Sequence, residues 1–282
     1  MKCAWQAYLN LLPFWMRSQV DSLGSDELQE LRLRIGRPPE LVLRDGAKFL
    51  DRNICGEDLT YCVNAASQYS PCSYATIAYG YITAAGGHRI GICGDIAIVN
   101  GNVSTVKNLT SLCIRVARDF PGIARQASIL KGSILLIGSP GRGKTTLLRD
   151  LVRQKSNNGN CAVAVVDERR ELFPVAGGGF CFSPGLRTEV ISGCSKSSGI
   201  DMMIRTMNPG WIAVDEITAE EDCRAIIRAA WCGVFLLATA HADSLQDFLK
   251  RPVYRPLIQR RIFENIIVMR HDKSWVLERM NI

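Results

Sequence analysis

Short, uniformly apolar runs alternate with stretches of helical spacing throughout the chain from Lys131 onward. Such runs, rich in valine and isoleucine, are typical of parallel strands that are buried on both faces of a sheet. Parallel strands need crossover connections, and two stretches with helical spacing, 145–154 and 219–231, supply them. The pattern therefore predicts an α/β domain. Its expected strands are Ile134 to Gly138, Ala162 to Asp167, Trp211 to Asp215, Val234 to Thr239 and Ile266 to Arg270.

The region before Lys131 has a different sequence pattern, in which strand-like segments are separated by turns that contain glycine or aspartate. We expect a smaller α+β domain here, which ends near the Pro121-Gly122 pair. Residues 1–125 would form this N-terminal domain and residues 126–282 the α/β domain. The expected strands of the smaller domain are Leu31 to Ile35, Leu41 to Arg44, Arg89 to Cys93 and Ile96 to Val99.

The chain begins with an apolar stretch from Trp5 to Met16, which Pro13 interrupts. No signal-peptide cleavage pattern follows it. The stretch predicts an amphipathic helix that packs on its own domain, and attachment to a membrane surface is the alternative.

Composition narrows the class of protein only a little. The 282 residues, 47% of them hydrophobic, suit one large or two small domains, and no apolar run approaches the length of a membrane-spanning helix. The 11 cysteines form neither a C-x-x-C pair nor a Cys/His cluster with zinc spacing, so we expect reduced, mostly buried thiols in a cytoplasmic protein. The net charge of +7 permits an anionic partner without requiring one, because the arginines are dispersed.

The sequence GSPGRGKTT lies between the first predicted strand of the α/β domain and its first helical stretch. It fits G-x-x-x-x-G-K-[ST], in which glycines let backbone N–H groups surround an anion at the positive end of a helix. Lys144 would reach the β- and γ-phosphates of a nucleotide, and the Thr145 hydroxyl would ligate Mg²⁺. A glycine-rich turn with a chance lysine is the alternative, which the flanking elements disfavour. The predicted nucleotide-binding residues are Gly138, Ser139, Pro140, Gly141, Arg142, Gly143, Lys144, Thr145 and Thr146.

A second motif ends the strand that begins at Trp211. Asp215 follows an apolar run downstream of the phosphate loop, as in a Walker B motif, and its carboxylate would hold Mg²⁺ through water. Glu216 would orient or deprotonate the attacking water. A whole strand between the two motifs favours the branch of P-loop ATPases with an inserted strand, which contains the RecA-like and AAA+ motors. The chain has no N-K-x-D motif for guanine, so ATP is the expected nucleotide.

Two more strand ends carry polar residues that would face the same crevice. Asp167 opens the acidic cluster DERRE, and either Glu168 or Glu171 is a candidate for the water-activating base. A solvated, charged turn is the alternative. His241 follows the strand that ends at Thr239, where it would contact the γ-phosphate or an acidic neighbour.

An arginine, often one from a neighbouring subunit, can stabilise the charge that develops on a γ-phosphate. The sequence alone pairs none of the chain's arginines with a phosphate, and surface ion pairs are the common alternative. The candidates are Arg89, Arg115, Arg187 and Arg205.

Taken together, these stretches resemble the secretion and retraction ATPases of type II and type IV pilus systems. In that family an acidic box, a Walker B strand preceded by an arginine and an Asn/Asp-Pro pair, and a histidine box follow the phosphate loop. Here DERREL, MIRTMNP with IAVDEI, and TAHADS appear in this order, without a tetracysteine zinc insert. The segments ELRLRIGRPPELVLRDG and GGHRIGICG resemble the family's PAS-like N-terminal domain. The short chain is most similar to the sporulation ATPases of this family.

The resemblance implies a homohexameric ring that hydrolyses ATP in the mother cell and energises the channel to the forespore during endospore formation. The ring would dock at the membrane through an integral membrane component of that sporulation channel, and no nucleic acid is expected as a partner. Glu171 or Glu168 would occupy the place of the family's catalytic glutamate. The Arg169-Arg170 pair departs from the family's acidic box, so the water-activating acid stays open among these two residues and Glu216.

Two other classes of function stay open from the residues alone. A RecA-like, nucleic-acid-dependent ATPase would use the same core and the basic charge. A nucleotide-dependent scaffold would bind ATP with little turnover. Stimulation of hydrolysis by DNA or RNA, with a steep salt dependence, distinguishes the first of these from a secretion-type motor.

Overall fold

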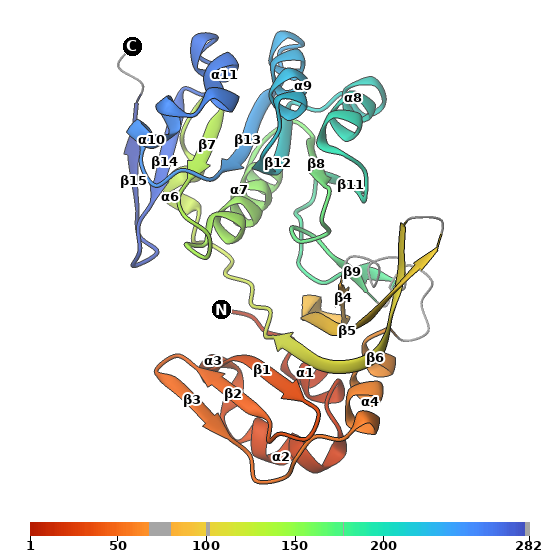
Figure 1. Cartoon of the computed structure of the whole chain (residues 1–282). Helices are drawn as coiled ribbons and strands as arrows, with labels where there is room; N and C mark the ends of the chain where they lie inside the picture. The colour runs from red at the N-terminus through yellow and green to blue at the C-terminus, as the bar shows by residue number, and fades with distance from the viewer. Residues whose placement is uncertain (68–79, 100–101, 177, 280–282) are drawn as a thin grey trace. The chain divides into compact units, whose positions relative to one another are not determined.

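The chain, described here as a computed structural model of residues 1–67, 80–99, 102–176 and 178–279, forms two compact units (Figure 1). Unit 1 comprises Met1–Asp119 and Pro174–Cys181, and unit 2 comprises Phe120–Phe173 and Phe182–Ile282. Each unit has its own hydrophobic core and is described by itself. The division of the sequence between residues 125 and 126 stays a prediction.

Unit 1 is built on an antiparallel sheet in the order β3-β2-β1-β6-β5-β4. Side chains alternate between its two faces, so Leu31 and Ile114 are fully buried while their neighbours are not. The strands are β1 (Leu28–Arg34), β2 (Glu40–Leu43), β3 (Gly46–Phe49), β4 (Tyr81–Thr83), β5 (Arg89–Val99) and β6 (Asn102–Arg115). The helices are α1 (Trp5–Asn10), α2 (Phe14–Asp21), α3 (Gly24–Glu27), α4 (Gly56–Ser67) and the 3₁₀ turn η1 (Ala85–Gly87).

The apolar stretch at the start of the chain is two helices instead of one. Pro13 is the N-cap of α2 and separates it from α1, because proline cannot donate the backbone hydrogen bond that a continuous helix needs. Tyr8, Leu12 and Met16 are fully buried in the core of unit 1. The prediction that this segment packs on its own domain is therefore confirmed.

One turn predicted in unit 1 is wrong. The segments Arg89 to Cys93 and Ile96 to Val99 belong to a single strand, β5, which continues through Gly94. β5 and β6 shift register between Cys93 and Asp95, so Gly94 lies in a bulge. A Cβ on Gly94 would lie only 2.5 Å from the carbonyl oxygen of Lys107. The glycine permits a close approach of two backbones and does not mark a turn.

A short hairpin of unit 1 comes from an unexpected part of the sequence. Strands β9 (Val175–Ala176) and β10 (Gly179–Phe180) follow β8 (Val163–Asp167) of unit 2 in the sequence but belong to unit 1, where β9 contacts η1. The chain therefore leaves unit 2 after Phe173 and returns to it at Phe182. Nothing in the hydrophobic pattern predicts this excursion.

Unit 2 contains a seven-stranded sheet in the order β11-β8-β12-β13-β7-β14-β15, in which only β15 is antiparallel. All five predicted strands are present within two residues of their expected ends. The strands are β7 (Ile134–Ile137), β8 (Val163–Asp167), β11 (Thr188–Ser192), β12 (Trp211–Ile217), β13 (Phe235–Ala240), β14 (Asn265–Met269) and β15 (Trp275–Glu278). The strand predicted between the two motifs in the sequence is β8, and in the sheet β13 lies between the motif-bearing strands β7 and β12.

Helices cover the sheet of unit 2 (Figure 1), and the parallel strands β7 and β8 are buried along their whole length. The predicted crossover helices are α7 and α9, whereas α8 has no counterpart among the predictions. The helices are α6 (Arg125–Ser128), α7 (Lys144–Asn158), α8 (Lys196–Met207), α9 (Glu220–Trp231), α10 (Leu245–Lys250), η2 (Pro252–Tyr254) and α11 (Arg255–Gln259).

The cysteines differ from expectation. All cysteines in the described ranges carry free thiols, but only Cys62 and Cys223 are buried. Cys232 is exposed because it lies at the C-cap of α9, beyond the apolar face of that helix. Among the residues that the structure describes, we find no helix of sufficient length and hydropathy to span a membrane.

Candidate active site

The phosphate loop joins β7 to α7 with a backbone that favours glycine. Gly141 and Gly143 have φ angles of 76° and 92°, in the left-handed region where a side chain is strained. Gly143 is also the N-cap of α7, a helix of 15 residues. The free N–H groups and the positive end of the helix dipole at this terminus favour an anion.

Lys144 is held inside the loop. The residue is 6% exposed, and its ammonium group donates hydrogen bonds to the carbonyl oxygens of Gly138 at 2.7 Å and Ser139 at 3.0 Å. Burial holds the pKa of Lys144 below its ordinary value, although the charges of Asp215 and Glu216 act in the opposite direction. A buried ammonium is costly unless an opposite charge compensates it, so the loop presents a fixed cation to an anionic ligand.

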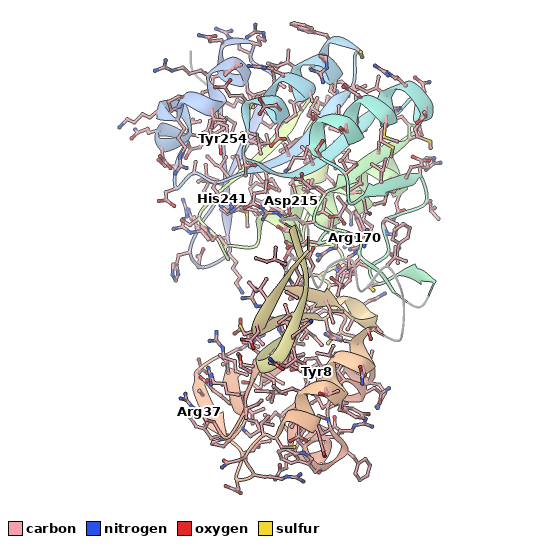
Figure 2. The ribbon with its side chains drawn as sticks, turned by 45° about the vertical axis from the view of Figure 1, so that its right-hand side comes forward. Tyr8, Arg37, Arg170, Asp215, His241 and Tyr254 are labelled. Atoms are coloured by element: carbon pink, nitrogen blue, oxygen red, sulfur yellow. The ribbon has the colours of Figure 1, made fainter. Side chains whose placement is uncertain are left out.

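Two hydroxyl groups fix the carboxylate of Asp215. The Thr145 hydroxyl donates to Oδ2 at 2.8 Å, and the Thr239 hydroxyl donates to Oδ1 at 2.5 Å. The Thr239 hydroxyl also accepts a hydrogen bond from the backbone N–H of Glu216 at 2.7 Å. Figure 2 shows Asp215 and His241 at the same edge of the sheet, where β12 and β13 end.

The donor set at this point fits Mg²⁺. A hydroxyl and a carboxylate oxygen are hard ligands, and Mg²⁺ in nucleotide sites takes few protein ligands because phosphate oxygens and waters complete its octahedron. Within the described ranges, no group of three or more His, Cys, Asp or Glu side chains could hold a metal ion by itself. Thr145 and Asp215 would therefore hold the ion only together with a phosphate ligand.

A bulge at the end of β12 directs Glu216. Val214 pairs with Ala238 and Ile217 with Ala240, so two residues of β12 lie opposite Thr239 alone. Glu216 itself has a φ of 59°, a left-handed conformation that is uncommon outside glycine.

The carboxylate of Glu216 contacts two side chains. Oε1 lies 2.5 Å from Nε2 of His241, and Oε2 forms an ion pair with Arg169. The other ring nitrogen of His241, Nδ1, lies 3.2 Å from the ammonium of Lys144. An ammonium can only donate, so Nδ1 accepts and the proton of a neutral ring lies on Nε2, facing Glu216. A continuous polar chain thus joins Lys144, His241, Glu216 and Arg169.

Asp167 organises the acidic segment after β8. It is 2% exposed, and its two oxygens accept hydrogen bonds from the backbone N–H groups of Glu171 and Phe173, each at 2.8 Å. Burial raises the pKa of Asp167 to about 6, while the backbone amides of Phe173 and Leu172 act to lower it. Arg149 also donates to the carbonyl oxygens of Glu171 and Leu172. The backbone at Glu171 is therefore fixed from two sides.

Glu168 points elsewhere and pairs with a buried lysine. Lys196 is 4% exposed, forms an ion pair with Glu168 and lies 3.8 Å from Oδ2 of Asp222. Lys196 is the first residue of α8, where a helix end disfavours a cation. Glu168 compensates that charge, which makes it a structural partner of Lys196.

Within unit 2, the predicted Arg205 lies apart from this cluster. Arg205 is exposed near the C-terminal end of α8. Because α8 begins at Lys196, which pairs with Glu168, Arg205 lies nine residues and about 14 Å farther along the helix axis. In unit 1, Arg89 lies over the ring of Tyr81, 4.1 Å from its centroid, and Arg115 lies 3.2 Å from Glu30.

Sequence reasoning did not assign a role to four residues that the structure brings to the site. In the sequence, Arg169 stands out only as a departure from the family's acidic box. For Thr239 the available signal is its place as a polar residue at the end of a buried strand. For Arg149 and Lys196 the signal was weaker, since both lie on helices. These residues are Arg149, Arg169, Lys196 and Thr239.

A cavity of about 580 Å³ in unit 2 adjoins the phosphate loop. Apolar side chains make up much of its wall, and Gln126 and Ser274 add polar groups. Arg142, from the loop, also donates to the carbonyl oxygen of Met269 at 3.3 Å. The lining residues are Phe120, Ile123, Gln126, Gly141, Arg142, Gly143, Thr146, Leu147, Met269, Lys273, Ser274 and Trp275.

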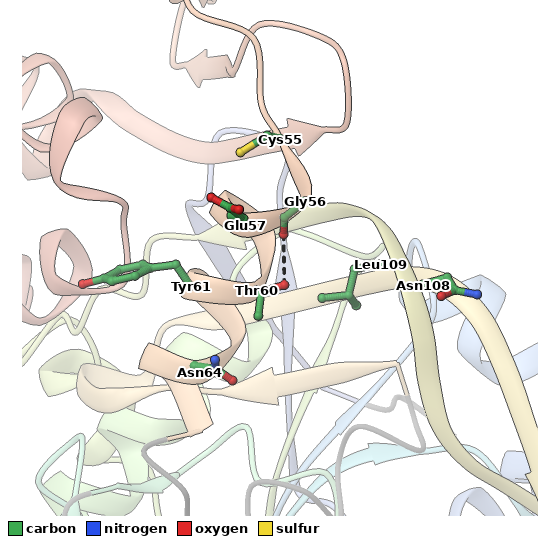
Figure 3. Close-up of a pocket in the computed structure, with 8 residues that line it drawn as sticks. All are labelled: Cys55, Gly56, Glu57, Thr60, Tyr61, Asn64, Asn108 and Leu109. Carbon is green, nitrogen blue, oxygen red and sulfur yellow. Dashed lines mark hydrogen bonds between the residues drawn. The ribbon is translucent and has the colours of Figure 1, made fainter.

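A second hollow, of about 950 Å³, lies in unit 1 between α4 and β6 (Figure 3). The Thr60 hydroxyl donates to the carbonyl oxygen of Gly56 at 2.9 Å, and the Tyr61 hydroxyl accepts from Arg17 at 2.6 Å. Among the described residues that line it, Glu57 is the one carboxylate and none is a cation. This hollow has no cluster of groups suited to catalysis.

Two solved structures share the fold of this chain, which is that of secretion and pilus ATPases with an α/β, mostly parallel sheet. The Legionella pneumophila ATPase DotB matches with a TM-score of 0.62 and 16% identity, over 95% of this chain and 80% of that chain. The pilus retraction motor PilT with bound ADP matches with a TM-score of 0.62 and 16% identity, over 92% of this chain and 79% of that chain. At this identity the likeness concerns the fold alone, and the PAS-like character of unit 1 stays a prediction.

The sequence identifies the family. Residues 8–276 match the family model described as "Sporulation stage III, protein AA". The chain is also 36% identical to "Stage III sporulation protein AA" of Bacillus subtilis (strain 168) over 279 residues, which cover 94% of this chain and 90% of that protein. The chain belongs to this family.

Proposed function

We propose that the protein is a Mg²⁺-dependent ATPase that works as a motor of a secretion-type channel or assembly complex during endospore formation. The observation that carries this proposal is the polar chain from Lys144 through His241 to Glu216. It links the cation of the phosphate loop to the acid that follows the Walker B aspartate. Membership of the sporulation family supports the biological setting.

Each residue has a role that follows from its contacts. The loop amides and Lys144 would bind the β- and γ-phosphates, because they form a cradle with one fixed cation. Glu216 would accept a proton from the attacking water, and His241 would hold that carboxylate toward the loop. When bound, Mg²⁺ would neutralise charge on the phosphate oxygens, and Thr145 and Asp215 are the residues suited to hold it.

The cavity beside the loop would hold the nucleoside. Its place next to Gly141, Gly143 and Thr146 puts it within reach of a base whose phosphates lie in the loop, and Trp275 and Phe120 offer flat apolar surfaces. All of its lining residues belong to unit 2.

The assembly is part of the proposal. We infer a ring of identical subunits in the mother cell that docks on an integral membrane component of the sporulation channel, with no nucleic acid as a partner. The likeness to secretion and pilus ATPases and the family membership support this arrangement.

The test compares the possible stimulators of hydrolysis. The purified full chain should hydrolyse ATP in the presence of Mg²⁺, gain mass in steps of whole subunits when ATP is added, and respond to a cytoplasmic fragment of the membrane component. Stimulation by DNA or RNA that falls steeply with salt would instead support a RecA-like, nucleic-acid-dependent ATPase. Binding of ATP without turnover would support a scaffold.

A further inference from the structure

We propose that Arg169 is a positioning residue that fixes the carboxylate of Glu216 for catalysis. This inference rests on the proposed ATPase function, which the sequence and the comparisons support without assigning any role to Arg169.

The contacts of Glu216 come from opposite sides of its carboxylate. His241 contacts Oε1 at 2.5 Å, and Arg169 pairs with Oε2. A glutamate side chain has several rotatable bonds, and a single contact leaves its terminal torsion free. Two donors on the two oxygens remove that freedom, and a guanidinium is well suited to it because its donors lie in a rigid plane.

The backbone brings Arg169 to this place. β8 and β12 are adjacent parallel strands that pair from Val163 with Trp211 to Val166 with Val214. Beyond these paired residues, the backbone that follows β8 and the end of β12 each contain a residue in the left-handed conformation. These residues are Arg170, with a φ of 56°, and Glu216, with a φ of 59°. Such conformations in residues other than glycine cost free energy, and they cluster where a site needs a particular geometry. Here these two left-handed residues change the direction of the backbone so that the side chains of Arg169 and Glu216 meet.

The neighbours of Arg169 in sequence are used differently, so the position is specific. Glu168 pairs with the buried Lys196. The guanidinium of Arg170 lies against Gly193, where an added Cβ would be 3.0 Å from its Nη2 atom. Arg169 pairs with Glu216 instead, and its exposed fraction of 56% leaves it accessible to solvent.

The consequence for catalysis is geometric. A general base must lie within hydrogen-bond reach of the proton that it accepts, and a displacement of about 1 Å can lower turnover on the order of a hundredfold. Loss of Arg169 frees the Oε2 side of Glu216, while His241 still holds Oε1. We therefore expect a fall in kcat of about 10- to 100-fold for Arg169→Ala, without a change in nucleotide affinity.

The experiment measures kcat and KM for ATP, and the dissociation constant of a non-hydrolysable ATP analogue. Arg169→Ala should lower kcat and leave KM and the dissociation constant within about twofold of wild type, as expected when an interaction matters only for the chemical step. Arg169→Lys, which keeps the charge, should recover part of the loss. Arg224→Ala is the matched control, because Arg224 belongs to an exposed pair with Glu220 on α9 and should leave kcat unchanged.

A double-mutant cycle separates positioning from direct action. If Arg169 acts through Glu216, then Arg169→Ala should have no further effect in a Glu216→Gln chain. Multiplication of the two losses would mean that Arg169 acts on the phosphate itself and would overturn the proposal, as would full turnover of Arg169→Ala in an active protein. A wild-type chain that binds ATP without hydrolysing it would instead overturn the proposed function.

Discussion

The hydroxyl of Thr145 donates a hydrogen bond to Oδ2 of Asp215 at 2.8 Å and so connects the start of α7 to the end of β12. The two strands that carry these motifs, β7 and β12, are not neighbours, because β13 lies between them. Their side chains meet because both lie at the carboxyl edge of the parallel sheet. Lys144 lies at the same edge, where a short chain of polar contacts connects it to Glu216. The predicted effects of substitutions at these residues depend on this arrangement.

Replacement of Lys144 by alanine should reduce ATP hydrolysis to background. The variant removes the ammonium that donates to the loop carbonyls of Gly138 and Ser139 and that would face the phosphates. Lys144→Ala should keep the far-UV circular dichroism spectrum of the wild type, while Lys48→Ala, an exposed position in β3, should keep full activity. Hydrolysis by Lys144→Ala at a tenth of the wild-type rate would show that the phosphate loop is wrongly assigned.

The second prediction concerns the acid that activates water. Glu216→Gln should retain ATP binding and lower turnover by about a hundredfold or more, because the variant loses the proton acceptor nearest to His241. Steady-state hydrolysis and analogue binding measure the two effects separately. Glu171→Gln is the comparison, since the resemblance to pilus ATPases keeps Glu171 as a candidate. Full turnover in Glu216→Gln, Glu171→Gln and Glu168→Gln would exclude all three candidate acids as the water-activating base.

A third prediction separates a structural acid from a catalytic one. After Glu168→Gln, the buried Lys196 keeps the more distant carboxylate of Asp222, at 3.8 Å, as a counter-charge. We expect the free energy of unfolding to fall by about 1–3 kcal/mol, the cost of leaving a buried polar group poorly paired. Turnover per folded molecule should stay near the wild-type value. Denaturant unfolding monitored alongside ATP hydrolysis tests this, and a loss of turnover with unchanged stability would contradict it.

The strands of unit 2 could be predicted from the sequence because uniform burial leaves a simple signature. All four residues of β7 and all five of β8 are buried, so every position of these strands is apolar or is the terminal aspartate. The motifs at the strand ends were likewise visible, since each polar residue interrupts an apolar run. The hydrophobic pattern reflects which positions are buried, and for that reason it locates the buried strands well.

Side-chain geometry at the site could not be predicted in this way. The pair of Arg169 with Glu216 depends on a bulge in β12 and on two left-handed residues, neither of which changes the hydrophobic pattern. At Gly94 the pattern alone does not distinguish a turn from a close approach of strands, because glycine permits both. Lys196 looks like a surface residue in sequence, and only the packing of α8 shows that it is buried.

The fourth prediction is a pH dependence of stability. Burial raises the pKa of Asp167 from 3.8 to about 6, so between these values the native state keeps a proton that the unfolded state has released. The free energy of unfolding therefore falls as pH rises through this window, in total by about 3 kcal/mol. Asp167→Asn cannot ionise and should lack this contribution.

Chemical denaturation of both proteins at several pH values between 4 and 7 measures the difference directly. Contributions from other titrating groups cancel when the two free energies are subtracted. The wild type should lose stability relative to Asp167→Asn as pH rises, mostly below pH 6. Parallel profiles would mean that Asp167 titrates normally in the folded protein.

The last prediction is that an arginine of unit 1 completes the active site of a neighbouring subunit. Arg89 and Arg115 lie directly opposite each other on β5 and β6, on the face that does not carry the buried Ile90 and Ile114. Arg115 is 61% exposed although it lies near Glu30, and an exposed pair of this kind contributes little to stability. Arg115 is the first candidate to reach a phosphate of another subunit and Arg89, which lies over Tyr81, is the second. In that place an arginine would raise turnover about a thousandfold or more.

Mixed rings test this dependence on assembly. Subunits with Arg115→Ala, or with Arg89→Ala, should be inactive alone, as should Lys144→Ala subunits. Rings that contain both kinds should regain part of the activity, because some intact phosphate loops then face intact arginines. Mixing Lys144→Ala subunits with a chain that carries both Lys144→Ala and Arg115→Ala is the control and should stay inactive. If activity does not recover at any ratio, in preparations shown by mass to contain mixed rings, the arginine does not act on a neighbouring subunit. It then interacts only within unit 1, where Arg115 lies near Glu30 and Arg89 lies over Tyr81.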